Sequence, residues 1–229
     1  MADDPVFLIT GASSGIGEAT ARAAAEAGYR LVLAARSEEK LGELSSELGG
    51  DERAMVVRCD VTEWSDQEAM VAKALEQFGR LDVVFANAGF GAPRGFLNSD
   101  PDHWKSMVLT NIYGVALTVR ATLPALKETE GHLLMTGSVA GRRALPGSLY
   151  AATKAAVHWI GEAARLELDR TGVRVTVIAP GITDTPFFDN PQGDGLRPAD
   201  VADAVLYAVS RPPHVDVNEV LVRPTAQQS

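Results

Sequence analysis

Residues 6–17 read Val6-Phe-Leu-Ile-Thr10-Gly11-Ala-Ser-Ser-Gly15-Ile-Gly17. The apolar beginning predicts a buried strand, and the glycines lie between it and a segment of helical period. Such a turn directs free backbone N–H groups at an anion. Gly11 can adopt the turn, Gly15 leaves room where a pyrophosphate would approach, and Gly17 lets the helix lie close to the strand. The stretch predicts the phosphate-binding turn of a dinucleotide site.

Two other interpretations of this stretch are possible. The spacing is G-x-x-x-G-x-G, which by itself also suits a merely tight turn. Residues 11–15 also spell the G-x-S-x-G of a hydrolase nucleophile elbow. That elbow needs an oxyanion loop from an earlier strand, and only one strand precedes Ser13. The strand-turn-helix context favours the nucleotide site over both.

Short apolar runs alternate with helical segments along the rest of the chain, which predicts a parallel α/β fold. Seven strands are predicted, at Pro5–Thr10, Arg30–Ala34, Ala54–Arg58, Leu81–Ala86, Gly131–Thr136, Val173–Ala179 and Glu219–Arg223. Six helices are predicted, at Gly15–Ala27, Ser37–Leu48, Glu63–Phe78, Pro101–Lys127, Ser148–Arg170 and Ala199–Ser210. Right-handed crossovers give a Rossmann-like, doubly wound parallel sheet with helices on both faces. No linker divides the chain, so residues 1–229 form one NAD(P)-binding domain with a short substrate loop at 182–197.

Composition narrows the class of protein. Of 229 residues 46% are hydrophobic, and 21 Lys and Arg against 30 Asp and Glu leave a net charge of −9. Such a charge disfavours nucleic-acid and anionic membrane partners. The single cysteine, Cys59, and the absence of a signal peptide or spanning segment predict a cytoplasmic protein. The four histidines lack metal-ligand spacing, so no metal is expected.

The end of the second strand indicates which dinucleotide is bound. NAD sites place an acid here, whereas this chain reads Ala34-Ala35-Arg36-Ser37. Arg36 can bind a ribose 2′-phosphate through two charge-assisted hydrogen bonds, and Ser37 adds a donor. NADP(H) is therefore favoured over NAD, the alternative being a solvated arginine. Asp60, with Val61 beside it, is placed to meet the adenine, although an acid at a helix start explains Asp60 equally well.

Tyr150 and Lys154 are four residues apart on a predicted helix, so their side chains project from one face. A nearby ammonium and a cationic nicotinamide could lower the phenol pKa from about 10 toward 7, which takes roughly 4 kcal/mol. Ser138 ends the fifth strand, where its hydroxyl could hold a substrate oxygen. Asn111 needs a partner if it is buried. Each residue alone has an ordinary structural role as an alternative, but together they predict acid/base chemistry during hydride transfer.

From Val6 to about Thr225 the sequence resembles the short-chain dehydrogenase/reductase family. The matching motifs are Thr10-Gly-Ala-Ser-Ser-Gly-Ile-Gly17, Asn87-Ala-Gly89, Asn111, Ser138, Tyr150-Ala-Ala-Thr-Lys154 and Pro180-Gly181. A weaker resemblance links residues 214–225 to serine/3-hydroxy-acid dehydrogenases. The family implies Tyr150 as the acid/base, Ser138 as the carbonyl-positioning residue, Lys154 as phenol tuner and ribose ligand, and Asn111 as the holder of a relay water. It further implies cofactor contacts at Gly11, Ser13, Ser14, Gly15, Ile16, Gly17, Asn87, Ala88, Gly89, Pro180, Gly181, Ile182 and Thr185.

Loops at the same sheet edge supply candidate substrate contacts, namely Leu145, Phe187 and Phe188 beside Ser138 and Tyr150. Arg94 or Arg142 could bind a substrate carboxylate, although a loop arginine is usually solvated. His158 is expected to serve packing. The resemblance implies a homodimer or homotetramer through helices 101–127 and 148–170. The function that follows is an NADP(H)-dependent alcohol dehydrogenase/carbonyl reductase; the alternative is a non-catalytic dinucleotide-binding redox sensor.

Overall fold

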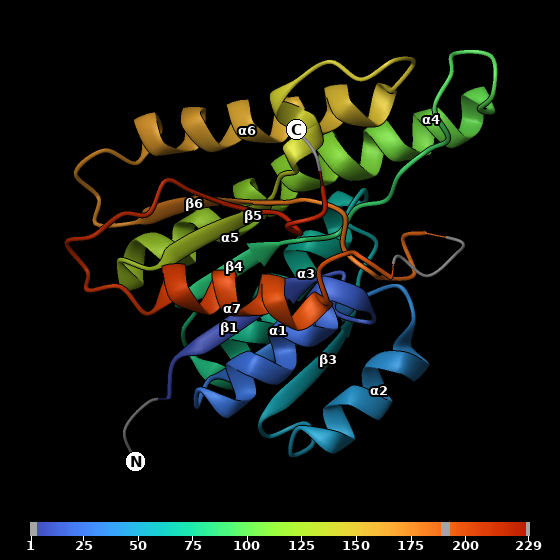
Figure 1. Ribbon diagram of the computed structural model, residues 1–229. Helices are drawn as coiled ribbons and strands as arrows, with labels where there is room; N and C mark the ends of the chain where they lie inside the picture. The colour runs from blue at the N-terminus through green and yellow to red at the C-terminus, as the bar shows by residue number, and fades with distance from the viewer. Residues whose placement is uncertain (1–3, 189–192, 228–229) are drawn as a thin grey trace.

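The computed structural model describes residues 4–188 and 193–227, and its strands form one parallel sheet of order β3-β2-β1-β4-β5-β6-β7 (Figure 1). The strands are β1 (Val6–Thr10), β2 (Arg30–Ala35), β3 (Ala54–Arg58), β4 (Val83–Ala86), β5 (His132–Thr136), β6 (Arg174–Pro180) and β7 (Glu219–Val222). All seven predicted strands are confirmed, with ends shifted by one or two residues. The order reverses beside β1, which opens a crevice at the carboxyl ends of β1 and β4.

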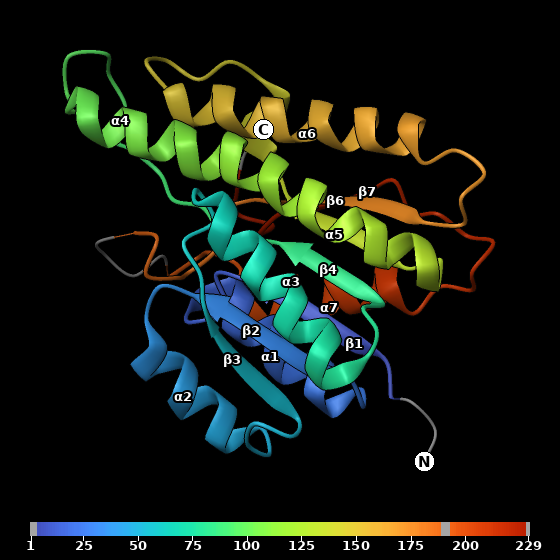
Figure 2. The ribbon, with the colours of Figure 1, turned by 180° about the vertical axis from the view of Figure 1, so that it is seen from behind.

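Helices cover both faces of the sheet. The helices α1 (Gly15–Glu26), α2 (Glu38–Glu47) and α7 (Pro198–Val209) pack on the face turned toward the viewer in Figure 1. On the opposite face lie α3 (Trp64–Phe78), α5 (Val115–Thr129) and α6 (Leu149–Glu167), which Figure 2 shows from behind. The predicted doubly wound architecture is therefore confirmed.

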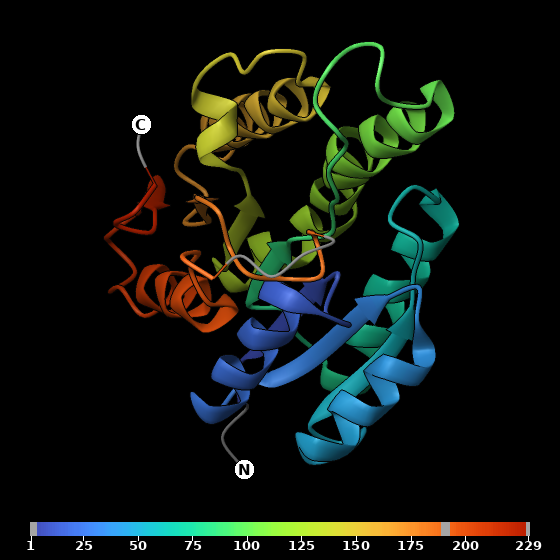
Figure 3. The same cartoon turned by 45° about the vertical axis from the view of Figure 1, so that its right-hand side comes forward.

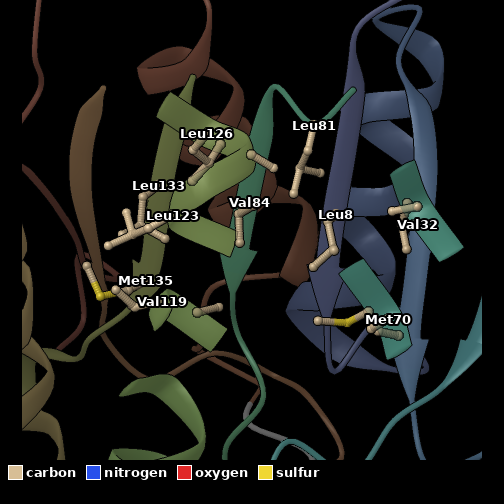
Figure 4. Packing of buried hydrophobic residues seen from close by; sticks show 14 of the residues in the cluster. Leu8, Val32, Met70, Leu81, Val84, Val119, Leu123, Leu126, Leu133 and Met135 are labelled. Carbon is tan, nitrogen blue, oxygen red and sulfur yellow. The ribbon is translucent and has the colours of Figure 1, made fainter. Parts of the chain in front are cut away.

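The alternation of side chains along β1 explains why two cores form. Val6 and Leu8 belong to the cluster beneath α3, α5 and α6, whereas Phe7 and Ile9 point into the cluster beneath α1 and α7. Figure 4 shows the first cluster, where Leu8 lies among side chains from neighbouring strands and from the helices above them. Every residue of β1 is buried, as expected for a central parallel strand.

The helix predicted over Pro101–Lys127 departs from an ordinary α-helix. It consists of α4 (Pro101–Val108), a π-helical turn (Leu109–Gly114) and α5, which continues to Thr129. Periodicity alone does not reveal such a turn, because one wider turn barely changes the apolar pattern. The wider turn contains Asn111, which is fully buried.

The connections at the carboxyl ends of the strands gather at one edge. Figure 3 shows the segment after β6 crossing above the start of α1 and the end of β4. Part of the loop predicted at 182–197, residues 189–192, lies outside the described residues. The elements that carry the predicted site therefore meet at this edge.

At the opposite end of the sheet, buried His132 ties β5 to β6 and makes stability depend on pH. Its Nε2 lies 2.7 Å from Thr176 Oγ1, and burial, helped by nearby Arg174, lowers the pKa of His132 to about 3. The unfolded chain takes up a proton near pH 6.5 and the folded chain does not, so stability falls as pH drops below 6.5.

Lowering the pH from 6.5 toward 4 should therefore reduce the free energy of unfolding by about 1.4 kcal/mol per pH unit through this group. Urea titrations of the wild type and His132→Gln at several pH values measure the effect. The amide can still donate to Thr176 but does not titrate. Identical pH slopes in the two proteins would show that His132 is not responsible.

Candidate active site

The glycine turn joins β1 to α1 with very little free space. Gly11 and Gly15 have φ angles of +67° and +57°, which favour glycine. A Cβ on Gly17 would lie 2.2 Å from the Gly11 carbonyl oxygen, so its absence allows α1 to approach β1. A Cβ on Gly15 would come within 3.2 Å of the Thr185 side chain. The Thr185 side chain, from the loop that follows β6, therefore takes the space beside Gly15.

A cavity of about 530 Å³ opens beside this turn. Its lining residues are Ser13, Ser14, Gly15, Glu18, Ala19, Arg22, Lys40, Glu43, Leu44, Glu47, Pro186 and Pro198. The volume is within the range of small-molecule sites. Ile16 is half-buried at the beginning of α1 and packs against the core rather than lining this cavity.

Asn87 and Thr10 fasten three strand ends together beneath the turn. Thr10 Oγ1 accepts hydrogen bonds from the backbone N–H groups of Asn87 and Ala88, at 3.0 and 3.2 Å. The Asn87 amide donates to the Thr10 carbonyl at 3.1 Å and accepts from Thr136 Oγ1 at 3.0 Å. Asn87 therefore supports the cradle by joining β1, β4 and β5, and its side chain is occupied by protein partners.

The end of β2 presents a free cation. Among the described residues Arg36 is exposed and forms no ion pair or side-chain hydrogen bond, and Ser37 precedes α2 without using its hydroxyl as a cap. Burial acts to raise the pKa of Asp60, but hydrogen bonds from Thr62 and the charge of Arg36 lower it overall. Val61 is buried, with its side chain against Gly114. Arg36, Ser37 and Asp60 thus lie near one another, while the Val61 side chain points into the core.

Tyr150, Ser138 and Lys154 meet beyond the end of β5. Tyr150 and Lys154 lie one turn apart on α6, with Lys154 Nζ 5.9 Å from the centre of the phenol ring. The Ser138 side chain interacts with the phenol, and its Oγ accepts a hydrogen bond from the backbone N–H of Ala140 at 3.0 Å. Lys154 is 4% exposed, and its Nζ donates to the carbonyl of Thr136 at 2.7 Å. The three predicted residues are thus brought together.

Without a bound nicotinamide, the pKa of Tyr150 is not lowered. Burial raises the pKa of Tyr150 to about 12, and the hydrogen bond to Ser138 opposes this only in part. Burial also lowers the pKa of Lys154 to about 8. Both shifts have one physical cause, since each charged form loses hydration in the closed site. The phenol is therefore a protonated acid at neutral pH.

Asn111 braces the site from the π-helical turn. Its Nδ2 donates to the Phe90 carbonyl at 2.8 Å and to Thr153 Oγ1 at 3.1 Å, and its Oδ1 accepts from the Phe90 N–H at 3.0 Å. Both donors are occupied, so a water could only donate to the remaining lone pair of Oδ1. A Cβ on Gly89 would lie 3.0 Å from this oxygen and 3.5 Å from Lys154 Nζ. The absence of a side chain at Gly89 therefore leaves room beside both Asn111 Oδ1 and Lys154 Nζ.

Phe187 forms an apolar wall beside the phenol. Its ring meets Tyr150 edge-on at 5.4 Å and Phe188 at 5.0 Å, and it is 41% exposed. A Cβ on Gly91 would lie 2.5 Å from the Phe187 ring, so that glycine makes room for it. Leu145 is half-buried in the turn before α6. The two phenylalanines thus lie where a pocket lining was expected, next to the phenol.

The segment after β6 ends the site. The Gly181 N–H donates to the Val222 carbonyl at 2.7 Å, and the Ile182 N–H donates to Gln227 Oε1 at 2.9 Å. Pro180 ends β6, and its carbonyl lies 3.5 Å from Ser138 Oγ. Sequence reasoning missed Gln227, because nothing in the final residues signals that they fold back here.

Neither a metal-binding cluster nor a membrane-spanning helix is found in the part of the chain that the structure describes. It contains no group of three or more His, Cys, Asp or Glu side chains arranged to hold a metal ion. None of its helices is long and apolar enough to pass through a membrane.

Known proteins are similar to this chain in sequence and in structure. A family model for short chain dehydrogenases matches residues 5–194. An uncharacterized oxidoreductase of Staphylococcus aureus strain MW2 is 41% identical over 226 residues, which cover 96% of this chain and 97% of the relative.

Solved structures agree. An alcohol dehydrogenase from the archaeon Thermococcus sibiricus, complexed with 5-hydroxy-NADP, has a TM-score of 0.91 at 35% identity, covering 98% of each chain. Serine dehydrogenase from Escherichia coli scores 0.89 at 32% identity, covering 98% of this chain and all of the other (100%). A 3-ketoacyl-(acyl-carrier-protein) reductase from Brucella melitensis, complexed with NADH, scores 0.87 at 30% identity, covering 95% and 96%. The chain therefore belongs to the short-chain dehydrogenase/reductase family and is an NAD(P)-dependent oxidoreductase.

Proposed function

We propose that the protein is an NADP(H)-dependent alcohol dehydrogenase/carbonyl reductase acting on a small substrate. The observation that carries this proposal is the convergence of Ser138, Tyr150 and Lys154 at the carboxyl end of β5, next to the glycine turn. The half-buried, protonated phenol is the form needed to donate a proton to a carbonyl oxygen. The alternative of a redox sensor without turnover receives no support from this acid/base arrangement.

The residues present fit a nicotinamide dinucleotide. No side chain caps the start of α1, so its first backbone N–H groups beside Ser13 and Ser14 can bind a pyrophosphate. When bound, the dinucleotide supplies or takes up the hydride. We assign the 2′-phosphate to Arg36 and Ser37, the adenine to the Asp60 side, and the nicotinamide ribose to Lys154.

The polypeptide's own part in the reaction is to hold an oxygen and move a proton. The Ser138 hydroxyl orients the substrate oxygen, which polarises the carbonyl bond. Tyr150 gives its proton to that oxygen during reduction and accepts one during oxidation. The Lys154 ammonium, anchored on the Thr136 carbonyl, stabilises the phenolate that remains.

The wall beside the phenol favours an uncharged substrate. Phe187 and Phe188 present apolar rings there, and Arg142 is paired with Glu219 through two guanidinium nitrogens. Arg142 is therefore not free to bind a carboxylate. NADPH oxidation measured with aldehydes, ketones, quinones and 3-oxo acids tests the proposal. Turnover of none of them would contradict it, and a preference for the acids would contradict the substrate class.

Replacing Arg36 with aspartate should change the preferred dinucleotide. Loss of charge-assisted hydrogen bonds costs roughly 1.5–3 kcal/mol, and the new carboxylate repels a phosphate. The ratio of kcat/KM for NADPH to that for NADH should fall by about 100-fold. Arg170→Asp, which makes the same charge change at the exposed end of α6, is the matched control. An unchanged ratio in the Arg36 variant would refute the phosphate contact.

We also propose a cytoplasmic homodimer or homotetramer. Trp159 and Leu166 on α6 are 76% and 80% exposed, and burying these large apolar side chains against a second copy would favour association. Light scattering of the purified protein would give its mass in solution. The single cysteine, Cys59, is buried and free, which is compatible with a reducing compartment.

A further inference from the structure

A chain of polar contacts lies behind Ser138, on the side away from the substrate. His158 of α6 brings Nε2 to 3.2 Å from the Ser138 carbonyl oxygen. Its Nδ1 lies 3.8 Å from Glu219 Oε1 on β7. Glu219 accepts in turn from Arg142 Nε at 2.9 Å, at the end of the 3₁₀ turn Val139–Arg142. The contacts join β7, α6 and the turn that follows Ser138.

The chemistry of these groups fixes which atom carries the imidazole proton. A carbonyl oxygen only accepts hydrogen bonds, so His158 Nε2 must be the N–H nitrogen. The second partner of the Ser138 carbonyl is the Gly141 N–H, at 3.0 Å. Burial lowers the pKa of His158, while the Ser138 carbonyl and Glu162 act to raise it and Arg142 and Lys154 act to lower it. His158 is thus a neutral donor at physiological pH.

Glycines on both sides of Ser138 permit this close packing. A Cβ on Gly137 would lie 2.9 Å from His158 Nε2. A Cβ on Gly141 would lie 2.7 Å from the main-chain carbon of Lys154. The strand end and the turn after it are therefore pressed against α6, and the imidazole occupies the space beside the first glycine.

We propose that His158 is a positioning residue that holds Ser138 in its catalytic geometry through the hydrogen bond from its Nε2 to the Ser138 carbonyl oxygen. The Ser138 carbonyl sets the plane of the following peptide, and Ser138 Oγ accepts from the Ala140 N–H two residues on. Fixing that plane fixes the direction of the hydroxyl. The hydroxyl hydrogen, which is donated to the Pro180 carbonyl across a long 3.5 Å, can then turn to a substrate oxygen. The inference rests on the proposed function of Ser138.

The test is a double-mutant cycle on carbonyl reduction. His158→Leu removes the donor and should lower kcat about tenfold, the effect of one hydrogen bond, with little change in NADPH affinity. His158→Gln places an amide N–H in a similar position and should retain kcat within about threefold. In a Ser138→Ala background, His158→Leu should have no further effect on kcat, because the group that it positions is already gone. His214→Leu makes the same change at an exposed position, and as the matched control it should leave kcat unchanged.

Each outcome decides a different point. Additive losses in the cycle, or an unchanged kcat in His158→Leu, would overturn the positioning role. Wild-type protein that reduces no carbonyl would instead contradict the proposed function. If His158→Leu does not fold, His158→Asn replaces it in the same cycle, because its shorter amide does not reach the Ser138 carbonyl.

Discussion

Changing Tyr150 to phenylalanine is expected to lower kcat for carbonyl reduction by about 10³-fold while NADPH binding is retained, since positioned acid/base groups contribute 10²–10⁴-fold. The substitution removes only the hydroxyl, so the ring contact with Phe187 at 5.4 Å should persist. Ser138 can still orient the substrate oxygen and Lys154 still supplies a positive charge nearby, so some activity should remain.

The steady-state rate of NADPH oxidation gives kcat, and fluorescence titration gives the NADPH dissociation constant. Tyr207→Phe makes the same chemical change on exposed α7 and serves as the control. A Tyr150→Phe enzyme with near wild-type kcat would remove Tyr150 from the mechanism. Equal loss of NADPH binding would show that the residue acts on the nucleotide instead.

Adding one methyl group at Gly17 should remove NADPH binding and destabilise the fold. The new Cβ would lie 2.2 Å from the Gly11 carbonyl oxygen and 2.8 Å from Asn87 Nδ2, so backbone atoms would have to move. Overpacking of this kind costs typically 1–3 kcal/mol, and here the movement displaces the turn that faces the phosphates. Gly17→Ala should bind NADPH at least 100-fold more weakly, a loss equivalent to about 2.7 kcal/mol.

Gly42→Ala provides the matched control. Gly42 lies within α2, and a Cβ there would meet nothing within 4 Å. Alanine should raise stability by up to about 1 kcal/mol, because glycine is the poorer helix former. Urea unfolding and NADPH titration of both variants make the comparison. Wild-type nucleotide affinity in Gly17→Ala would show that the close approach of α1 to β1 is not required.

Much of this architecture is predictable from local pattern. Buried parallel strands such as β1 are continuous apolar runs. The glycine spacing that follows β1 is typical of the turn between a strand and a helix in a nucleotide site. The four-residue separation of Tyr150 and Lys154 gives their common face, because helix geometry is fixed. These features depend on neighbours along the chain.

What could not be predicted depends on atoms brought from elsewhere. The pKa of Tyr150 rises because distant segments enclose the phenol, and residue spacing carries no information about enclosure. His158 gains its partners only when β7 places Glu219 beside α6. Gln227 reaches Ile182 across the sheet edge. Such contacts are properties of the tertiary fold.

The π-helical turn at Leu109–Gly114 means that the site depends on the number of residues in this helix. An α-helix advances about 100° per residue, so deleting one residue there would swing Asn111 away from Phe90 and Thr153 while the rest of the helix could still form. Insertions and deletions should therefore be excluded from this stretch during evolution, even where single substitutions are accepted. In any library built on this scaffold, varying the number of residues between α4 and α5 would be more damaging than varying their identity.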